Sequence, residues 1–481
     1  MLRKSCVTIV ALSYLWLDVP FFSTAAFAQQ RHTAKAAAEV TVTNPMSSYS
    51  DIVSSLVKKG LTEQQAYKNL AELTGKIGGR LSGSPQAAKA VTWGKNLMEK
   101  LGFQNVRLQN VMVPHWVRGK VEKAWIVGRK GRKNIPLAIC ALGGSIATPK
   151  KGITAEVIEV HSLAEAKALG PEAKGKIIFF NRPMDPTLVS TFAAYGGAVD
   201  QRGGGASAAA SVGGVGALIR SMTLVVDNVP HTGVMYYRDS IPKVPTAALS
   251  TVAANRLSDN LKRNPHLRVH FALDCKTLSD VKSANVIGEL PGTEFPNEVI
   301  VMGGHLDSWD KGKGAHDDGV GVTQSIEALR LIKELGLKPK RTIRVVLFMN
   351  EENGSRGGEG YAAQLPANEK AVAAIESDAG GFDPRAFGVS ADSSVFQKIA
   401  SWASLLEPTD ICSIRRGGGG EDISYLKDKG AALIGLVPSN QRYFDYHHSD
   451  KDVLANVNSR ELELGAIAMA SLAYFISEEG L

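Results

Sequence analysis

The stretch Val299-Ile-Val-Met-Gly-Gly-His-Leu-Asp-Ser308 joins an apolar run to a histidine and a carboxylate. A short continuous apolar run is typical of a buried strand, here Val299–Met302. A second run, Thr342–Met349, leads in the same way into Glu351 and Glu352. In open α/β sheets, ligands bind at the edge where parallel strands end. The spacing therefore predicts that polar side chains distant in sequence converge at one sheet edge.

The chain on both sides of this stretch alternates between strand and helix patterns. Helices are expected at Gly319–Leu335, from about Ser394 to Leu406 and near Ser459–Ser477, and further strands at Ala371–Ile375, Phe387–Val389 and Ala432–Val437. Strands that alternate with helices predict a mostly parallel-containing mixed sheet that is flanked by helices, an α/β fold.

The N-terminal part predicts a helix that begins after Ser84 and ends before Gly102, followed by a strand at Val106–Val113. Between about Lys120 and Asp280 the pattern changes to short β-rich runs around the Gly-, Ala- and Ser-rich span Gly203–Gly216. This span lacks the strand–GxGxxG–helix context of a nucleotide loop, and a small-residue helix packed closely on a sheet is the better interpretation. We expect an inserted β-rich domain at 120–280, between two parts of a larger domain at 29–119 and 281–481.

The first 28 residues have the pattern of an export signal. Arg3 and Lys4 precede the apolar run Val7–Leu17, and Ala26-Phe-Ala28 is a small-x-small cleavage site. The run is too short for a membrane anchor, since a spanning helix needs about 20 apolar residues. An exported protein, periplasmic or secreted and without a stable membrane anchor, is expected.

Charge and cysteine content exclude other classes of protein. The formal charge of +8 on 481 residues is not concentrated in one place, so no nucleic-acid partner is expected. The cluster Arg129–Lys133 is interpreted as a turn between strands. Beyond the signal, Cys140, Cys275 and Cys412 are widely spaced and form no CxxC pair. At most one disulfide is possible within the chain. None has the surroundings of a nucleophile.

The candidate site residues gain their meaning as a set. Alone, an HxD pair, an Asp-Asp-Gly turn, a Glu-Glu-Asn-Gly turn or a His-His pair is an ordinary surface or cap feature. Together they would place several carboxylates at neighbouring strand ends, where they repel one another unless a cation lies between them. Zinc accepts imidazole and carboxylate ligands, and two zinc ions about 3.5–4 Å apart can assist a hydrolysis. The set is His305, Asp307, Asp317, Glu351, Glu352, Asp378 and His448.

Several motifs resemble the co-catalytic zinc aminopeptidase family. They are Gly79–Pro85, Gly304–Ser308, Ala315–Gly319, Asn350–Ser355 and His448–Asp452. Within the expected insert, Gly216–Ser221, Pro230–Gly233 and Ile241–Thr246 are similar to the plasma glutamate carboxypeptidase branch of that family. The resemblance implies the zinc aminopeptidase fold with a protease-associated-like insert, and two Zn²⁺ ions per chain.

The resemblance also implies a role for each residue of the set. His305 and Asp378 would bind one zinc ion, Glu352 and His448 the other, and Asp317 would bridge them. Glu351 would be the general base that takes a proton from water, and Asp307 would fix the tautomer of His305 by a hydrogen bond. A cis peptide between Asp317 and Asp318 is implied as well.

Three assignments rest on weaker signals. His447 and His448 compete for one ligand position, and the H-S-x-x-D pattern favours His448. His316 is interpreted as a neutral residue at the rim of the site and not as a third histidine ligand. Gly417–Gly420 and either Tyr443 or Tyr446 are candidates for shaping the substrate pocket.

These features predict an exported dinuclear zinc exopeptidase that hydrolyses dipeptides or short peptides with a free N-terminus, an aminopeptidase or dipeptidase. The resemblance favours dipeptides and implies a homodimer. One alternative is a zinc transferase of the glutaminyl cyclase type on the same fold, which uses one zinc ion. Another is a non-catalytic, receptor-like binding module.

Overall fold

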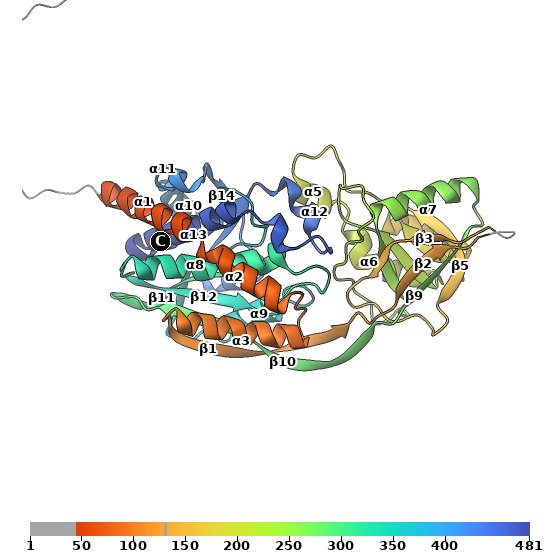
Figure 1. Ribbon diagram of the computed structural model, residues 1–481, viewed down its shortest axis with the longest axis horizontal. Helices are drawn as coiled ribbons and strands as arrows, with labels where there is room; N and C mark the ends of the chain where they lie inside the picture. The colour runs from red at the N-terminus through yellow and green to blue at the C-terminus, as the bar shows by residue number, and fades with distance from the viewer. Residues whose placement is uncertain (1–44, 129–131) are drawn as a thin grey trace, which may run out of the picture. The chain divides into compact units, whose positions relative to one another are not determined.

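The computed structural model describes residues 45–128 and 132–481. The expected export signal at 1–28 lies outside the described residues, as does most of the Arg129–Lys133 turn. The described strands form two eight-stranded sheets, and both are mixed (Figure 1). Within the described ranges, no helix combines the length and the apolarity that a membrane crossing requires.

The first sheet has parallel pairs at its centre, antiparallel pairs on either side of them, and a parallel pair, β14 with β15, at one edge. Strand β11 pairs in parallel with β12 and β13, and β13 pairs in parallel with β16. The order is β1 (Gln104–Val117), β10 (Lys276–Leu290), β12 (Arg341–Phe348), β11 (Phe295–His305), β13 (Lys370–Glu376), β16 (Ala432–Pro438), β14 (Pro384–Ser390) and β15 (Ser413–Arg416). The predicted mixed, parallel-containing sheet is confirmed.

Helices cover the first sheet because side chains alternate across each strand. In β11, Ile300 and Met302 join a core with the helices of one face, whereas Val299 and Val301 join a second core on the other face. The first face carries α1 (Pro45–Glu63), α3 (Pro85–Lys100), α8 (Val320–Glu334) and α13 (Ser459–Glu479). The other carries α9 (Arg356–Ala363) and the 3-10 helix η5 (Ser424–Lys429).

Helix boundaries follow the local sequence closely. Ser84 caps α3 by accepting a hydrogen bond from the Ala87 N–H at 3.1 Å, and Gly102 follows the helix with φ of 68°. The single helix expected up to Leu406 is two helices, α10 (Ser393–Ala400) and α11 (Ala403–Leu406). A helix of one turn, α12 (Tyr443–Tyr446), precedes the two adjacent histidines.

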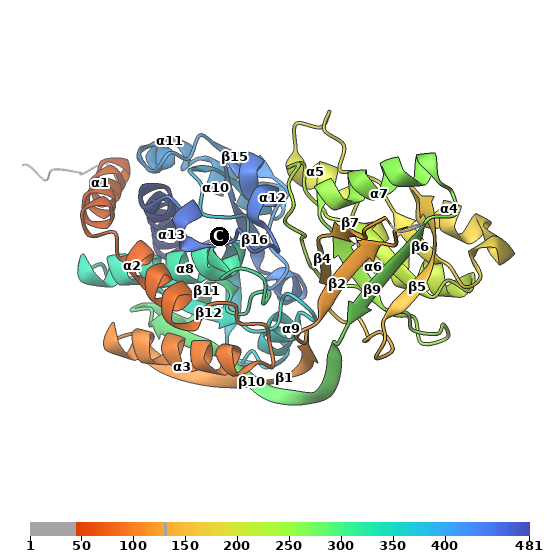
Figure 2. The same cartoon turned by 45° about the vertical axis from the view of Figure 1, so that its right-hand side comes forward.

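The second sheet is built from residues between Glu122 and Leu273 (Figure 2). Long antiparallel strands β1 and β10 lead into it and out of it. Its order is β3 (Ile135–Leu137), β2 (Glu122–Ile126), β9 (Arg268–Leu273), β5 (Ile153–Val160), β6 (Ile177–Phe180), β7 (Gly216–Arg220), β8 (Thr246–Leu249) and β4 (Ile139–Ala141). The helices of this part are α4 (Leu163–Ala168), α5 (Thr191–Gly196), α6 (Asp200–Ser211) and α7 (Thr251–Arg263).

The Gly/Ala/Ser-rich span forms α6, as expected. A Cβ atom at Gly205 would lie 2.9 Å from Ile219 and 3.2 Å from Phe180, whose side chains belong to the sheet beneath. The small residues therefore allow α6 to approach β6 and β7 closely.

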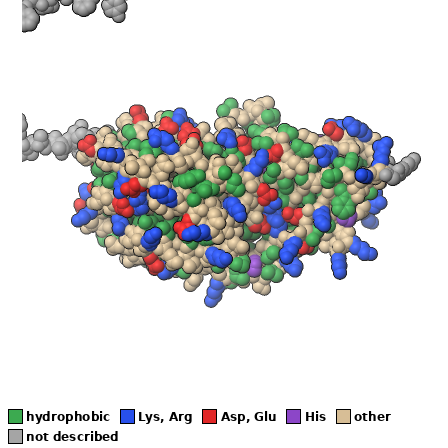
Figure 3. Space-filling model, viewed as in Figure 1, with side chains coloured by type: hydrophobic (Ala, Val, Ile, Leu, Met, Phe, Trp, Pro, Cys, Tyr) green, Lys and Arg blue, Asp and Glu red, His purple; other side chains and the backbone are tan. Residues whose placement is uncertain are grey.

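The sequence predicts that the surface charges are dispersed and that the three cysteines form at most one disulfide. Basic and acidic side chains are interspersed over much of the face shown in Figure 3. Cys140 and Cys275 are buried and Cys412 is exposed, and each is a free thiol.

The packing of α6 can be tested by paired substitutions. Gly205→Val should lower the free energy of unfolding by about 1–3 kcal/mol relative to Gly203→Val, since overpacking of a close contact has that cost. A Cβ at Gly203 would meet no atom within 4 Å, so this control carries the same helix-propensity cost without the clash. Denaturant unfolding of both variants measures the difference, and equal stabilities would contradict the close packing.

Candidate active site

The sheet brings the candidate residues together at one edge. His305 is the last residue of β11, Glu351 and Glu352 follow β12, and Asp378 follows β13. Because β11, β12 and β13 are parallel, their carboxyl ends meet at the same edge. Asp317 lies in the turn η3 (Ala315–Gly319) before α8, where the Asp317–Asp318 peptide is cis.

Asp317 lies at the centre of the cluster. Its Oδ1 is 3.1 Å from His305 Nε2, and its Oδ2 is 3.1 Å from His448 Nε2. Asp378 Oδ1 lies 3.6 Å from the same atom of His305, and Glu352 Oε2 lies 3.1 Å from the same atom of His448. The two oxygens of one carboxylate therefore each face a different imidazole, and each imidazole has a further carboxylate beside it.

The donor set fits metal ions. His305, Asp317 and Glu352 offer ligand atoms within 4.8 Å of one another, as do Asp317, His447 and His448. Asp317 Oδ2 and Asp378 Oδ1 are buried and, although each faces an imidazole, neither accepts a well-formed hydrogen bond. Buried polar atoms normally have partners, so these atoms indicate a bound group.

Electrostatics favour a cation at the same place. Burial lowers the pKa of His305, but the Asp317 and Asp378 carboxylates raise it more, and the net direction is up. Burial, and then neighbouring carboxylates, raise the pKa of Glu352 to about 7. Burial and the charge of Asp378 raise the pKa of Glu376 to about 8. Such crowding of carboxylates destabilises their charged forms unless positive charge is added.

Glu351 and Glu352 take different positions. The Glu352 side chain is 2% exposed, and its Oε1 accepts a hydrogen bond from the Trp309 N–H at 2.9 Å. The Glu351 side chain is 23% exposed, and its Oε2 lies 4.0 Å from His305 Nε2. Glu351 is therefore the member of the pair with more access to a bound molecule.

Asp307 contacts His305 through its backbone and not through its carboxylate. The His305 Nδ1–H donates to the Asp307 carbonyl at 3.0 Å, which leaves the Nε2 lone pair toward Asp317. The carboxylate Oδ1 lies 3.9 Å from Nδ1 and instead accepts from the Asn350 and Glu351 N–H groups at 2.6 and 3.1 Å. Asp307 thus holds both His305 and the turn that carries Glu351.

Of the two adjacent histidines, His448 lies closer to the cluster. His447 Nε2 is 3.8 Å from Asp317 Oδ2, and its ring stacks on that of His448 at 3.5 Å. Residues of the segment 122–273, which contains the second sheet, hold the backbone of both histidines. The His231 Nδ1–H donates to the His447 carbonyl at 2.7 Å, and the Thr232 N–H donates to the His448 carbonyl at 2.9 Å.

The expectation that His316 lies at the rim is wrong. Its side chain is fully buried and stacks between Phe382 at 4.7 Å and Tyr446 at 5.0 Å. The Gly381 N–H donates to its Nδ1, and its Nε2–H donates to the Asn456 carbonyl. Burial lowers its pKa to about 4, which favours the expected neutral form. Both ring nitrogens are occupied, which leaves none for a metal.

Sequence reasoning missed several buried charged residues around the cluster. Arg80, fully buried, donates to the carbonyls of Leu306, Lys313 and Gly314 at 2.5–3.0 Å and so holds the loop between His305 and Asp317. The sequence feature that could have indicated Arg80 is its position in the Gly79–Pro85 motif. Glu376 and Asp422 are missed carboxylates, and Asp318 and Asp452 belong to the quoted motifs without an assigned role; all four are buried.

A cavity of about 340 Å³ opens onto the cluster. Asp317, Glu351, Glu352, Asp378 and His448 line it on the side of the first sheet. Residues of the second sheet's segment and the α12 region supply further wall, namely Phe192, Tyr195, Arg202, Val234, Tyr236, Tyr443, Phe444 and His447. Tyr443 is thus the tyrosine of the expected pair that lines this cavity, and Gly418–Gly420 line an adjoining one with Glu376 and Asp378.

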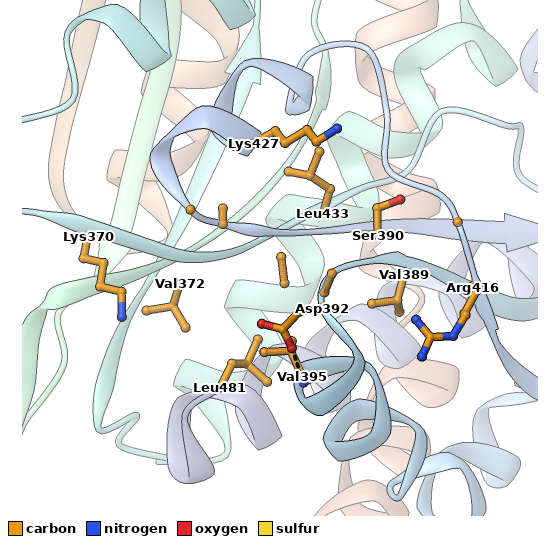
Figure 4. Close-up of a pocket in the computed structure, with 15 residues that line it drawn as sticks. Lys370, Val372, Val389, Ser390, Asp392, Val395, Arg416, Lys427, Leu433 and Leu481 are labelled. Atoms are coloured by element: carbon orange, nitrogen blue, oxygen red, sulfur yellow. Dashed lines mark hydrogen bonds between the residues drawn. The ribbon is translucent and has the colours of Figure 1, made fainter.

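A larger cavity of about 640 Å³ lies elsewhere (Figure 4). Of its described lining residues, Asp392 is the only carboxylate, and its Oδ1 caps α10 by accepting from the Val395 N–H. Lys370, Arg416 and Lys427 extend from its borders. Its described lining contains no histidine and no pair of carboxylates, so the smaller cavity is the candidate active site.

Comparison with known proteins agrees with this geometry. Residues 285–473 match the model of peptidase family M28. The chain is 35% identical over 434 residues to carboxypeptidase Q of Bos taurus, which covers 89% of each protein, and carboxypeptidase Q of Homo sapiens gives 35% over 420 residues. A peptidase M28 precursor from Shewanella amazonensis SB2B has a similar crystal structure, with a TM-score of 0.86, 33% identity and coverage of 91% of this chain and 98% of that one. A zinc aminopeptidase from Bacillus subtilis shares the fold, with a TM-score of 0.63 and 19% identity over 86% and 95% of the two chains.

Fold and relatives together define a peptidase, and its site has a donor set that could hold metal ions. The chain belongs to peptidase family M28, and its similarity to the carboxypeptidase Q proteins extends over most of its length, the second sheet included.

The role of Arg80 can be tested by stability. Arg80→Met should lower the free energy of unfolding of the metal-free protein by about 3 kcal/mol or more, because three buried carbonyls lose their donors and nearby carboxylates lose a buried cation. Arg415→Met, at an exposed position, is the control and should change stability by less than about 0.5 kcal/mol. Similar melting curves for the two variants would show that Arg80 does not hold the loop.

Proposed function

We propose that this chain is a dinuclear zinc exopeptidase that acts on dipeptides or short peptides with a free N-terminus. The observation that carries the proposal is the position of Asp317, whose two oxygens each lie 3.1 Å from the Nε2 atom of a different histidine. A carboxylate in that position suits a bridge between two metal ions, and a single-metal site has no need of it.

The residues divide between the two ions. His305 and Asp378 would hold one, and Glu352 and His448 would hold the other, with Asp317 shared. Bound zinc would supply Lewis acidity that polarises a peptide carbonyl and makes water more acidic. Glu351 would accept the proton of the attacking water and pass it to the leaving amine, as its exposure to the cavity permits.

Recognition of a free N-terminus follows from charge. The cavity is bordered by Glu351, Asp378 and Glu421, and a protonated amine is a suitable partner for such carboxylates. The wall from residues 192–236 limits the space beside the cluster to about 340 Å³, which suits short substrates. The carboxypeptidase Q relatives support this proposal at the level of family and overall architecture.

The wider setting is part of the same proposal. We infer that residues 120–280 are a domain inserted into the peptidase domain and that this domain shapes substrate access and supplies no metal ligand. Export through the signal at 1–28, expected from its residue pattern, and assembly as a homodimer, implied by the resemblance, complete the proposal.

Metal content and the two adjacent glutamates provide one test. The wild-type protein should contain two zinc ions per chain by elemental analysis. Glu351→Gln should keep both ions and lose about 10²–10⁴-fold in turnover, because an amide accepts no proton. Glu352→Gln and Asp317→Ala should lose zinc as well as activity. One zinc ion per chain after supplementation would favour the transferase class, and a Glu351→Gln variant with near wild-type turnover would contradict the assigned roles.

Substrate modification provides another test. N-acetylation of a good dipeptide should abolish cleavage, since the neutral amide offers no charge to the carboxylates, and extension at the C-terminus should slow cleavage progressively. Chromatographic product analysis of the free, acetylated and extended peptides measures both effects. Equal rates on free and acetylated dipeptides would exclude dependence on the N-terminus, and efficient internal cleavage of a long peptide would exclude exopeptidase action.

A further inference from the structure

One cation lies in the wall of the candidate active site. Of the cavity's described lining residues, Arg202 is the only lysine or arginine. It comes from α6, and its side chain is 7% exposed. The proposed catalysis uses none of its atoms.

Much of the hydrogen-bonding capacity of Arg202 is free. Its Nη2 donates to the Tyr195 hydroxyl at 2.7 Å, while Nε and Nη1 are buried without a partner. No ion pair among the described residues includes Arg202 within 4.0 Å. A guanidinium carries five N–H donors and stays charged, so a buried one without an anion is costly.

Of the other buried arginines in the described residues, three pair with a carboxylate. Arg344 pairs with Glu289 and Glu369, Arg330 with Glu327 and Glu63, and Arg118 with Asp310. Arg80 has three backbone carbonyls instead. Arg202 has neither arrangement, although it is buried to a similar degree. Arg202 lines the cavity, so an anion bound there would lie beside the guanidinium.

The surroundings of Arg202 hold its guanidinium in place. Tyr195 lies beneath it, with the ring centroid 5.4 Å from Cζ, and the same ring lies 5.4 Å from that of His447. On another side, a Cβ at Gly233 would lie 2.5 Å from Cζ and Nη1, so only glycine leaves room for the charge there. Gly233 has φ of 130°, which also favours glycine. Helix α5, which carries Tyr195, lies next to α12 in both views (Figures 1 and 2), where Tyr195 stacks on Phe444 at 4.7 Å.

We propose that Arg202 binds the C-terminal carboxylate of the substrate and so selects dipeptides. The proposal rests on the proposed exopeptidase function and narrows it. An extended dipeptide spans about 7 Å, a length that a cavity of about 340 Å³ accommodates. Its amine meets the carboxylates near the cluster and its carboxylate meets the guanidinium, so both charged ends are matched. A longer peptide presents a neutral carbonyl to Arg202, which accepts a weaker hydrogen bond than a carboxylate does.

The experiment compares Ala-Leu with its C-terminal amide, Ala-Leu-NH₂, in the zinc-loaded full chain. Wild type should prefer the free acid by about 10- to 100-fold in kcat/KM, the range expected for a hydrogen-bonded charge pair. Arg202→Met, which keeps much of the side-chain volume, should reduce that ratio to within about threefold, chiefly through a raised KM for the acid. Arg202→Lys should keep part of the preference, because it keeps the charge and loses the planar donor set.

A matched control and a second readout decide the remaining outcomes. Arg238→Met, at an exposed position on the same segment, should keep the wild-type ratio. A ratio in Arg202→Met equal to that of wild type would overturn the proposal. If no peptide is cleaved by the zinc-loaded wild type, the proposed function fails, and calorimetric binding of Ala-Leu decides the role of Arg202. Binding to wild type that is at least tenfold tighter than to a folded Arg202→Met variant supports the role, and equal or absent binding refutes it.

Discussion

Mutual repulsion among buried carboxylates is the constraint on which the candidate site depends. Asp317, Glu352, Asp378, Glu376 and Asp422 lie at or near one sheet edge, and burial raises the cost of charging each of them. Two imidazoles and the buried Arg80 offset part of that cost. Added positive charge at this edge would therefore stabilise the arrangement. This is the physical reason that a metal centre is a better interpretation of the cluster than a structural network.

The sheet makes this arrangement possible because its backbone ladders and apolar cores position the strand ends, and the polar side chains do not. Strands β11, β12 and β13 are held by parallel ladders and by cores on both faces, so their carboxyl ends are fixed without help from the polar residues. Backbone groups then orient the side chains. The Asp307 carbonyl fixes the His305 tautomer, and the Asp307 carboxylate holds the turn before Glu351. Polar groups at this edge are consequently free to serve a ligand.

The sequence predicts the central strands of the first sheet because each is a short, continuous apolar run next to a longer helical pattern, and it does not predict β10 or β15. It also predicts which residues converge, since polar groups after parallel strands must meet. It does not predict the environment of His316, because the rings of Phe382 and Tyr446 come from distant segments. It gives no sign of Arg202, a single charge in a Gly- and Ala-rich helix whose partners are set by tertiary packing. It does not predict which acceptor of Asp307 contacts His305, since sequence cannot distinguish a backbone from a side-chain acceptor.

The two sheets contribute unequal but inseparable parts of the site. The first sheet supplies the acidic and imidazole groups, while the segment from the second sheet supplies Arg202 and much of the cavity wall. That segment also donates hydrogen bonds from His231 and Thr232 to the carbonyls of His447 and His448. The contacts that restrict the cavity are therefore continuous with those that orient His448. Removal of the segment would free the backbone of a candidate ligand as well as open the cavity, so the cavity wall and the position of His448 depend on the same contacts.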